Sequence, residues 1–141
     1  MEIFQTPDFA ALLKTLTKPK YSNLYGTVNQ EIAAFFSHYS SFEQVWQKSY
    51  MLYENAFIRI NKIRLENEQQ NSGESGGFRM IIICDKRTKQ ICLLYIYPKV
   101  GPLGMDSTNL EFTKKLVKNY SEAKASGLLK PYRSIKISKN K

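Results

Sequence analysis

The first apolar residues of the chain follow a short strand pattern and then a helical one. Residues 1–6 are predicted to form a strand that Pro7 ends, and Thr6 or Asp8 is suited to cap a helix with Pro7 in its first turn. That helix is indicated by apolar residues at helical spacing, namely Phe9, Leu12, Leu13 and Leu16. Pro19 and the polar residues that follow it are expected to break the helix.

A second helix is predicted from about Leu24 to Tyr39, where Ser40 and Ser41 interrupt the pattern. Its apolar face carries Val28, Ile32, Phe35 and Phe36. Residues 42–55 fit two interpretations, a further helical turn or the beginning of a long strand.

Residues 57–66 have a strand pattern whose alternation changes phase. Ile58 and Ile60 share one parity, whereas Ile63 and Leu65 share the other. A bulge at residues 61–62, with Lys62 inside it, would return all four to one face, because one extra residue shifts the alternation by one. Arg59, Arg64 and Glu66 would then point the opposite way. An irregular strand with solvated charges fits this pattern equally well.

Two nearly continuous apolar strands, 78–84 and 90–97, follow a polar loop at residues 67–77 and are joined by residues 85–89. Their composition predicts central strands covered on both faces. After a loop at 98–106, the pattern Thr108-x-x-Glu111 predicts a capping box. The helix it begins is expected to end at Gly127. Its inward residues are Phe112, Leu116, Val117 and Tyr120, and its outward residues are Lys114, Lys115 and Lys118.

This order of elements predicts an α+β fold in a single domain spanning residues 1–141. A small antiparallel sheet is expected, with the N-terminal helices packed on one face and a C-terminal helix. Residues 132–138, within the basic tail 125–141, are interpreted either as an edge strand or as a disordered segment.

Positive charge is concentrated in the second part of the chain. Residues 1–56 hold four lysines and five acidic residues, whereas residues 57–141 hold 17 basic and 7 acidic residues, and the formal net charge is +9. Such a balance, with interspersed aromatic residues, favours a polyanionic partner, either nucleic acid or an acidic protein. A merely soluble basic surface is the alternative.

Several classes of protein are disfavoured. Only Cys84, Cys92 and His38 supply cysteine or histidine, so a structural zinc site and a two-histidine ribonuclease are not expected. The two cysteines lie in apolar runs and are predicted to be buried reduced thiols. The sequence shows no secretion signal and no apolar run of membrane-spanning length, so a cytoplasmic protein without membrane or cofactor is expected.

Candidate chemistry gathers at the open end of the predicted hairpin. Gly76-Gly77 leads to Arg79, and the returning strand ends with Tyr97 and Lys99. Two registers place Arg79 opposite Tyr95 or opposite Tyr97, and in both Arg79 and Tyr97 share a face. Arginine matches two phosphate oxygens, tyrosine stacks on a base or exchanges a proton, and a desolvated lysine can act as acid or base. The ordinary alternative is a solvated arginine beside core tyrosines.

Three segments carry a resemblance to a known family: KIRL at 62–65, GESGGFRMII at 73–82 and ICLLYIYPK at 91–99. In this order, with the turn at residue 85, they resemble the RelE/HigB-type toxins of bacterial toxin–antitoxin pairs. The match covers residues 57–124. It implies a RelE-like α+β endoribonuclease that cuts mRNA on the ribosome without a metal ion, and that a cognate antitoxin protein neutralises.

The resemblance also implies roles for individual residues. Arg79 would stabilise the pentacovalent phosphate, Lys62, Arg64 and Lys99 would hold flanking phosphates, and Tyr97 would stack on or position the nucleotide. Further nucleic-acid contacts are expected from Arg59, Lys114, Lys115 and Lys118. The general base stays open between a lysine, Tyr97 and Glu66.

The chain departs from this pattern in several places. Glu74 stands in a loop that is often basic in such toxins, and an apolar turn follows Lys99. The segment 42–56 and the basic tail after Gly127 are additions to the pattern. Two other functions therefore remain as alternatives. One is a ParE-like toxin that blocks DNA gyrase, and the other is a basic nucleic-acid-binding module without catalysis.

Overall fold

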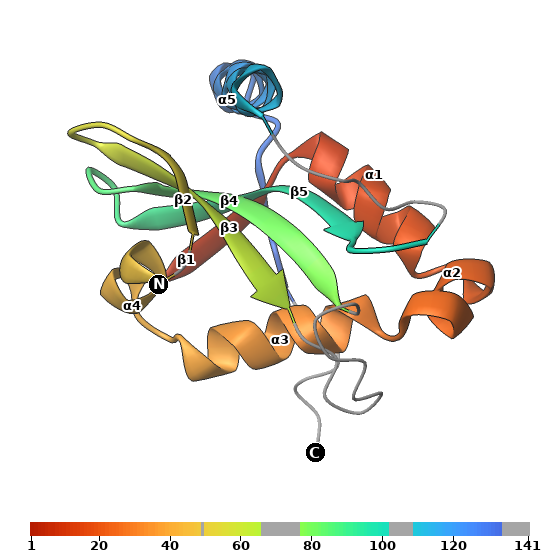
Figure 1. The fold of residues 1–141 in the computed structure, drawn as a ribbon. Helices are drawn as coiled ribbons and strands as arrows, with labels where there is room; N and C mark the ends of the chain where they lie inside the picture. The colour runs from red at the N-terminus through yellow and green to blue at the C-terminus, as the bar shows by residue number, and fades with distance from the viewer. Residues whose placement is uncertain (49, 66–76, 102–108, 134–141) are drawn as a thin grey trace.

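The computed structural model describes residues 1–48, 50–65, 77–101 and 109–133, which form an α+β fold with a six-stranded open sheet (Figure 1). The helices are α1 (Pro7–Leu16), α2 (Pro19–Tyr25), α3 (Val28–His38), α4 (Phe42–Gln47) and α5 (Leu110–Ala125). The strands are β1 (Glu2–Gln5), β2 (Tyr50–Glu54), β3 (Ile58–Leu65), β4 (Phe78–Asp85), β5 (Gln90–Pro98) and β6 (Lys130–Pro131).

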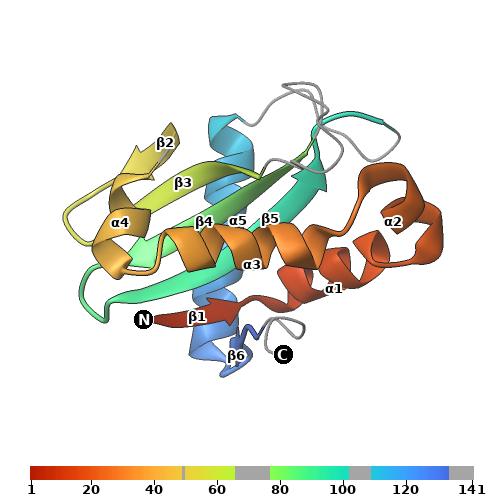
Figure 2. The same cartoon turned by 90° about the horizontal axis from the view of Figure 1, so that it is seen from below.

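The sheet is mostly antiparallel and has the strand order β2-β3-β4-β5-β1-β6. Strands β2 to β5 form an antiparallel meander. The N-terminal strand β1 pairs parallel to β5, with Glu2 beside Gln90, and β6 pairs antiparallel to β1 at the other edge (Figure 2). The sequence had indicated a purely antiparallel sheet. The structure differs, because β1 runs in the same direction as β5.

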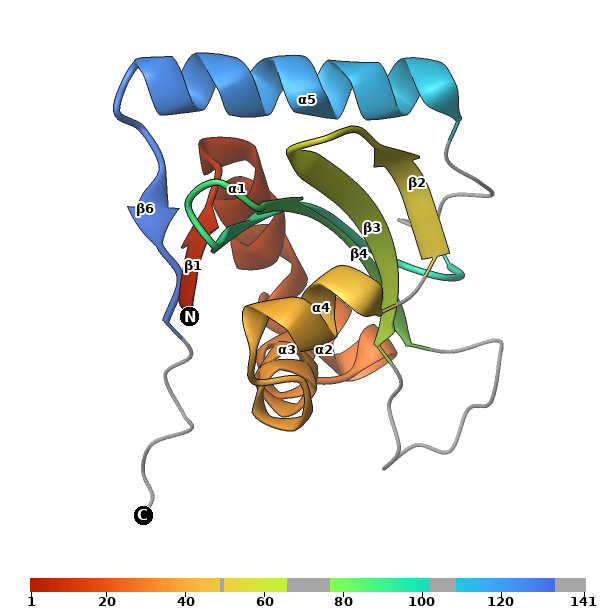
Figure 3. The same ribbon diagram turned by 90° about the vertical axis from the view of Figure 1, so that its left-hand side faces the viewer.

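Helices cover both faces of the sheet rather than one. Figure 3 shows α5 across one side and α2, α3 and α4 on the other. Helix α1 packs along β5, α3 packs on β3, and α4 packs on β4. Helix α5 contacts β2 and β5. The prediction that the helices cover one face is thus wrong for α5. It failed because the apolar runs of the strands do not say which helix covers which face.

The change of phase in β3 also follows from the covering of both faces of the sheet by helices. Ile60 is buried in the core beneath α5, whereas Ile63 and Leu65 are buried in the core beneath α1, α3 and α4. A strand covered on both faces can bury residues of either parity, so no extra residue is needed. The predicted bulge at residues 61–62 is wrong, since β3 pairs with β4 without interruption from Ile58 to Leu65.

Irregular pairing occurs instead in β2 and β5. In β2 the register shifts between Met51 and Tyr53. In β5 the partners of Ile81 and Ile82 are Tyr95 and Leu93, which leaves one extra residue in β5. This extra residue puts Arg79 opposite Tyr97, although the strands pair Asp85 with Gln90 at the turn.

The N-terminal helices differ from the predicted pair. Thr6 caps α1 by accepting a hydrogen bond from the Phe9 backbone N–H at 3.1 Å. The first helix ends at Leu16, before Pro19 as predicted, but the residues that follow are helical. Pro19 begins α2, because a proline is well tolerated in a first helical turn. Gly26, with φ of 99°, ends α2, and α3 starts at Val28. Residues 42–55 contain both elements that the sequence offered as alternatives, the helix α4 and the strand β2.

The C-terminal helix has clear signals at both ends. Asn109 is the N-cap and accepts a hydrogen bond from the Phe112 backbone N–H at 2.8 Å. The predicted cap, Thr108, lies outside the described residues. Gly127, with φ of 70°, follows the helix, and the Leu128 N–H donates to the Ala123 carbonyl at 2.8 Å. This is a Schellman-type end, so the predicted stop at Gly127 is confirmed.

The central strands β4 and β5 are almost completely buried, as their composition predicted. Cys84 and Cys92 lie in these strands as buried free thiols, and burial raises the pKa of each to about 12. A thiol held protonated in this way is a poor nucleophile. Across the described residues, none of the helices has both the length and the apolar character needed to span a membrane. The edge strand comes earlier than predicted, at β6, and residues 134–141 lie outside the described part.

Candidate functional site

All five predicted catalytic residues lie at positions that face the side of the sheet that α5 covers. Arg79 and Tyr97 are direct cross-strand partners on β4 and β5. Lys62 on β3 pairs with Ile81, two residues from Arg79, and so shares that face. Lys99 follows the end of β5, and its backbone N–H donates to the Gly77 carbonyl at 3.1 Å. The hairpin register therefore gathers side chains that are far apart in sequence.

The charged groups of this set act on one another. Burial lowers the pKa of Lys62, and the positive charges of Arg79 and Lys99 lower it further. Burial raises the pKa of Tyr97, while Arg79 acts in the opposite direction. We call Lys62, Arg79, Tyr97 and Lys99 the basic cluster. Three mutually repelling cations in a partly desolvated place form a site that an anion would stabilise.

The members of the basic cluster differ in exposure. Arg79 is 8% exposed, and one of its guanidinium nitrogens, Nη1, donates to the Phe78 carbonyl at 3.3 Å. Tyr97 is 3% exposed and belongs to the core beneath α5, so its ring does not offer a face to a base. Lys62 and Lys99 are half-buried, and the Lys62 ammonium lies 5.7 Å from the ring centre of Tyr50. The two lysines are thus the more accessible cations.

Arg64, the fifth of these residues, is the direct cross-strand partner of Arg79, so the register puts it on the same face of the sheet as Lys62. It is exposed near the end of β3, where it also borders a pocket beside α3. Arg59 has the opposite parity to Lys62 and makes a 2.9 Å hydrogen bond from Nε to Asn61 Oδ1. The predicted turn of Arg64 away from the Ile63 face holds, but Arg59 lies on the other face of the sheet from Arg64.

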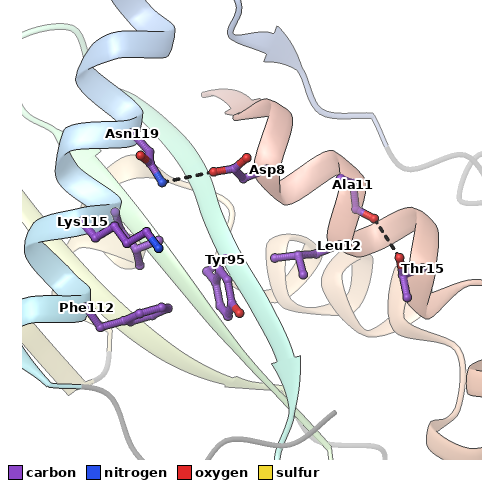
Figure 4. Close-up of a pocket in the computed structure, with 9 residues that line it drawn as sticks. Asp8, Ala11, Leu12, Thr15, Tyr95, Phe112, Lys115 and Asn119 are labelled. Carbon is purple, nitrogen blue, oxygen red and sulfur yellow. Dashed lines mark hydrogen bonds between the residues drawn. The ribbon is translucent and has the colours of Figure 1, made fainter.

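A pocket of about 360 Å³ adjoins the basic cluster between α1 and α5. Tyr95 lines it, and its ring centre lies 6.0 Å from that of Tyr97 and 4.9 Å from that of Phe112. At the other end Asn119 Nδ2 donates to Asp8 Oδ2 at 3.1 Å, bridging the two helices (Figure 4). Sequence reasoning missed Tyr95 and Asp8 as site residues, because no short motif links residues on α1, β5 and α5.

The lysines of α5 take different positions relative to this pocket. All three predicted nucleic-acid contacts on α5, Lys114, Lys115 and Lys118, are exposed. Lys115 lines the pocket, and its side chain reaches toward the gap between α5 and α1 (Figure 4). The outward orientation predicted from helical periodicity is therefore confirmed for all three lysines.

Histidine and metal chemistry find little support in the described parts of the chain. His38 is exposed at the end of α3, where its ring packs edge-to-face on Tyr39 with centres 4.7 Å apart. No group of three histidine, cysteine, aspartate or glutamate side chains there is arranged to hold a metal ion. Glu66, one of the candidate general bases, lies outside the described residues.

Comparison of the chain with protein-family models, with curated proteins and with solved structures finds no match to any of them.

Proposed function

We propose that the protein is a metal-independent endoribonuclease that cleaves mRNA at the basic cluster and acts as the toxin of a toxin–antitoxin pair. The observation that carries this proposal is the gathering of Lys62, Arg79, Tyr97 and Lys99 on one face of the sheet. The cations attract a phosphodiester, and RNA supplies its own nucleophile, the ribose 2′-hydroxyl.

The pKa shifts assign roles within the cluster. A lowered pKa increases the share of neutral amine on Lys62, and the neutral amine is the form that accepts the 2′-hydroxyl proton. Tyr97, whose pKa is raised, is suited to donate a proton to the departing 5′-oxygen. Arg79 and Lys99 stabilise the negative charge that develops on the pentacovalent phosphate. The products are a 2′,3′-cyclic phosphate and a free 5′-hydroxyl, with no metal ion required.

The pocket between α1 and α5 gives this reaction a place for a base. Tyr95 and Phe112 supply aromatic surface there, and the ring of Tyr95 contacts those of both Tyr97 and Phe112. Aromatic side chains bind unstacked bases in single-stranded RNA. We therefore assign base stacking to Tyr95 in place of Tyr97, whose ring is enclosed in the core.

The finer features of the proposal come from the family resemblance of residues 57–124. It supports a RelE-like arrangement of the sheet, cleavage on the ribosome in the cytoplasm, and neutralisation by a cognate antitoxin. The net charge of +9 is consistent with both an RNA substrate and an acidic protein partner.

The test is cleavage of ribosome-bound and free mRNA in the presence of a metal chelator. We expect the wild type to produce 2′,3′-cyclic ends, and Lys62→Ala to lose cleavage by at least 100-fold, the size typical of a general base. Lys14→Ala is the matched control, because Lys14 is an exposed lysine on α1 that lies outside the cluster and the pocket. Absence of cleavage by the wild type on both substrates would refute the proposal.

Growth after induced expression separates the alternatives. Arrest with cut mRNA that Arg79→Ala abolishes supports the ribonuclease. Arrest with a DNA-damage response and intact mRNA would identify a gyrase inhibitor instead. Growth without arrest would leave a basic binding module.

A further inference from the structure

Tyr50 is an exposed aromatic residue beside the basic cluster. It begins β2, the strand at one edge of the six-stranded sheet (Figure 2). Its exposed fraction of 66% exceeds that of every other large apolar or aromatic residue in the described part of the chain. Single exposed aromatic residues are common on proteins, so exposure alone assigns no role to Tyr50. Its position relative to Lys62 and Tyr95 does.

The sheet places Tyr50 in one row with the proposed general base. Tyr50 pairs with Lys62 across β2 and β3, Lys62 pairs with Ile81, and Ile81 pairs with Tyr95. Residues paired across strands share a face, so all four side chains start from the face that α5 covers. The Lys62 ammonium lies 5.7 Å from the ring centre of Tyr50. An exposed aromatic ring is therefore in direct contact with a cation of the basic cluster.

Positive charge lies between Tyr50 and the second aromatic residue of this face. Arg79 and Tyr97 form the next row toward the open end of the hairpin, and the charge of Arg79 acts on Lys62. Tyr50 is at the sheet edge on one side of these cations, and Tyr95 is in the pocket between α1 and α5 on the other. This arrangement fits a phosphate backbone that carries a base on each side, because single-stranded nucleic acid binds to cations flanked by aromatic rings.

The separation of the two aromatic residues limits the form of the RNA. Tyr50 and Tyr95 are three strand spacings apart, and neighbouring strands lie about 4.8 Å from each other, so their backbones are roughly 14 Å apart. Stacked bases lie only about 3.4 Å apart along a duplex strand. Two adjacent nucleotides can therefore reach both rings only with their bases unstacked. Unstacking also suits the reaction, because attack requires the 2′-hydroxyl in line with the departing 5′-oxygen.

We propose that Tyr50 binds a second base, so that single-stranded RNA lies across the basic cluster with one base on Tyr50 and the adjacent base on Tyr95. The inference rests on the proposed function, because it takes RNA as the ligand of the cluster. The contact surface is available, since most of Tyr50 is exposed and β2 is the last strand on its side of the sheet in the described part of the chain. Every base has a ring face, so stacking on Tyr50 does not depend on the RNA sequence.

The test is fluorescence anisotropy with a labelled hexamer of 2′-O-methyladenosine, whose blocked 2′-oxygens prevent cleavage. Tyr50→Ala is expected to weaken binding by about tenfold, the size of one lost base–aromatic stack. Tyr50→Phe, which retains the ring, is expected to bind as the wild type does. Tyr53→Ala is the matched control, because Tyr53 is an exposed tyrosine of the same strand that pairs with Ile60 and not with a residue of the basic cluster.

A hexamer without bases separates stacking from charge. This abasic probe has the same phosphates, so Tyr50→Ala is expected to leave its affinity unchanged. If Tyr50 acted only by holding Lys62 in place, the abasic probe would lose affinity as well. Salt dependence gives a second readout. Tyr50→Ala should keep the slope of log affinity against log salt, whereas Lys62→Ala should reduce it by about 0.7, the value for one phosphate on a single strand.

The outcomes distinguish this inference from the proposed reaction. Absence of hexamer binding by the wild type, unchanged binding by Tyr50→Ala, or equal weakening of both probes would each overturn the role of Tyr50. Cleavage of unmodified mRNA together with hexamer binding that does not depend on Tyr50 would refute this inference alone. Binding that depends on Tyr50 without any cleavage would refute the proposed reaction and leave the base site standing.

Discussion

Replacement of Glu31 by glutamine should stabilise the folded protein, and only at neutral and alkaline pH. Both carboxylate oxygens of Glu31 are enclosed without a partner, and burial raises its pKa from 4.5 to about 7. Below about pH 4 the acid is protonated in folded and unfolded chains alike, so the free energy of unfolding does not change with pH through Glu31. Between these pKa values the unfolded chain releases a proton that the folded chain retains, so wild-type stability falls as pH rises.

The size of this effect follows from the pKa shift. A shift from 4.5 to about 7 corresponds to at most about 3.4 kcal/mol above pH 7. Because the residue is partly exposed, solvent screening reduces the expected difference to about 1–2 kcal/mol. Glutamine retains the shape of the side chain and cannot ionise, so Glu31→Gln should not show the loss.

Urea unfolding of wild type and Glu31→Gln across this pH range measures the difference directly. We expect the free energy of unfolding of the variant to rise relative to that of the wild type from about pH 4 to about pH 8, and to level off at a difference of about 1–2 kcal/mol. Glu111→Gln replaces an exposed acid in the first turn of α5 and should stay within about 0.5 kcal/mol of wild type. A difference between wild type and Glu31→Gln that does not change with pH would refute the account of Glu31 as a desolvated acid.

Three other substitutions test the fold and the cluster. Asn61→Ala should cost about 2–4 kcal/mol in urea unfolding, because the buried Asn61 amide donates at 3.2 Å to the carbonyls of both Val45 and Trp46 and would leave them unpaired. Gly127→Ala should cost about 1 kcal/mol in the same assay through its φ of 70° alone, because no atom lies within 4 Å of the added methyl group, and an unchanged midpoint would contradict this. Lys99→Ala should raise the pKa of Lys62, since the charge of Lys99 contributes to lowering that pKa. An NMR titration of the lysine side chains measures it, and an unchanged pKa of Lys62 would show that the two charges do not interact.

Much of the fold could be predicted from local patterns. The continuous apolar runs of β4 and β5 identified both as central strands, and they are nearly fully buried. The periodicity of α5 correctly gave its buried and exposed sides, and Gly127 marked its end. These features depend on residues close in sequence, so a single chain is sufficient to reveal them.

The missed features depend on contacts between distant segments. The two-sided burial of β3 resembled a bulge, because the sequence does not show that α5 covers one face and α3 the other. The side chain of Asn61, placed in that bulge by the sequence argument, instead joins β3 to α4. The burial of Glu31 was missed because an isolated acid on a helix looks solvated until its neighbours are known.

The position of β1 determines when the sheet can be completed. Strand β1 lies between β5 and β6, so residues 2–5 must wait for the synthesis of residues 90–98 before they can pair, and for residues 130–131 before both of their edges are covered. During synthesis this segment has no partner strand, although the helices behind it can already form. We therefore expect insertion of β1 to be a late and slow step in folding, because the segments that it joins are separated by most of the chain.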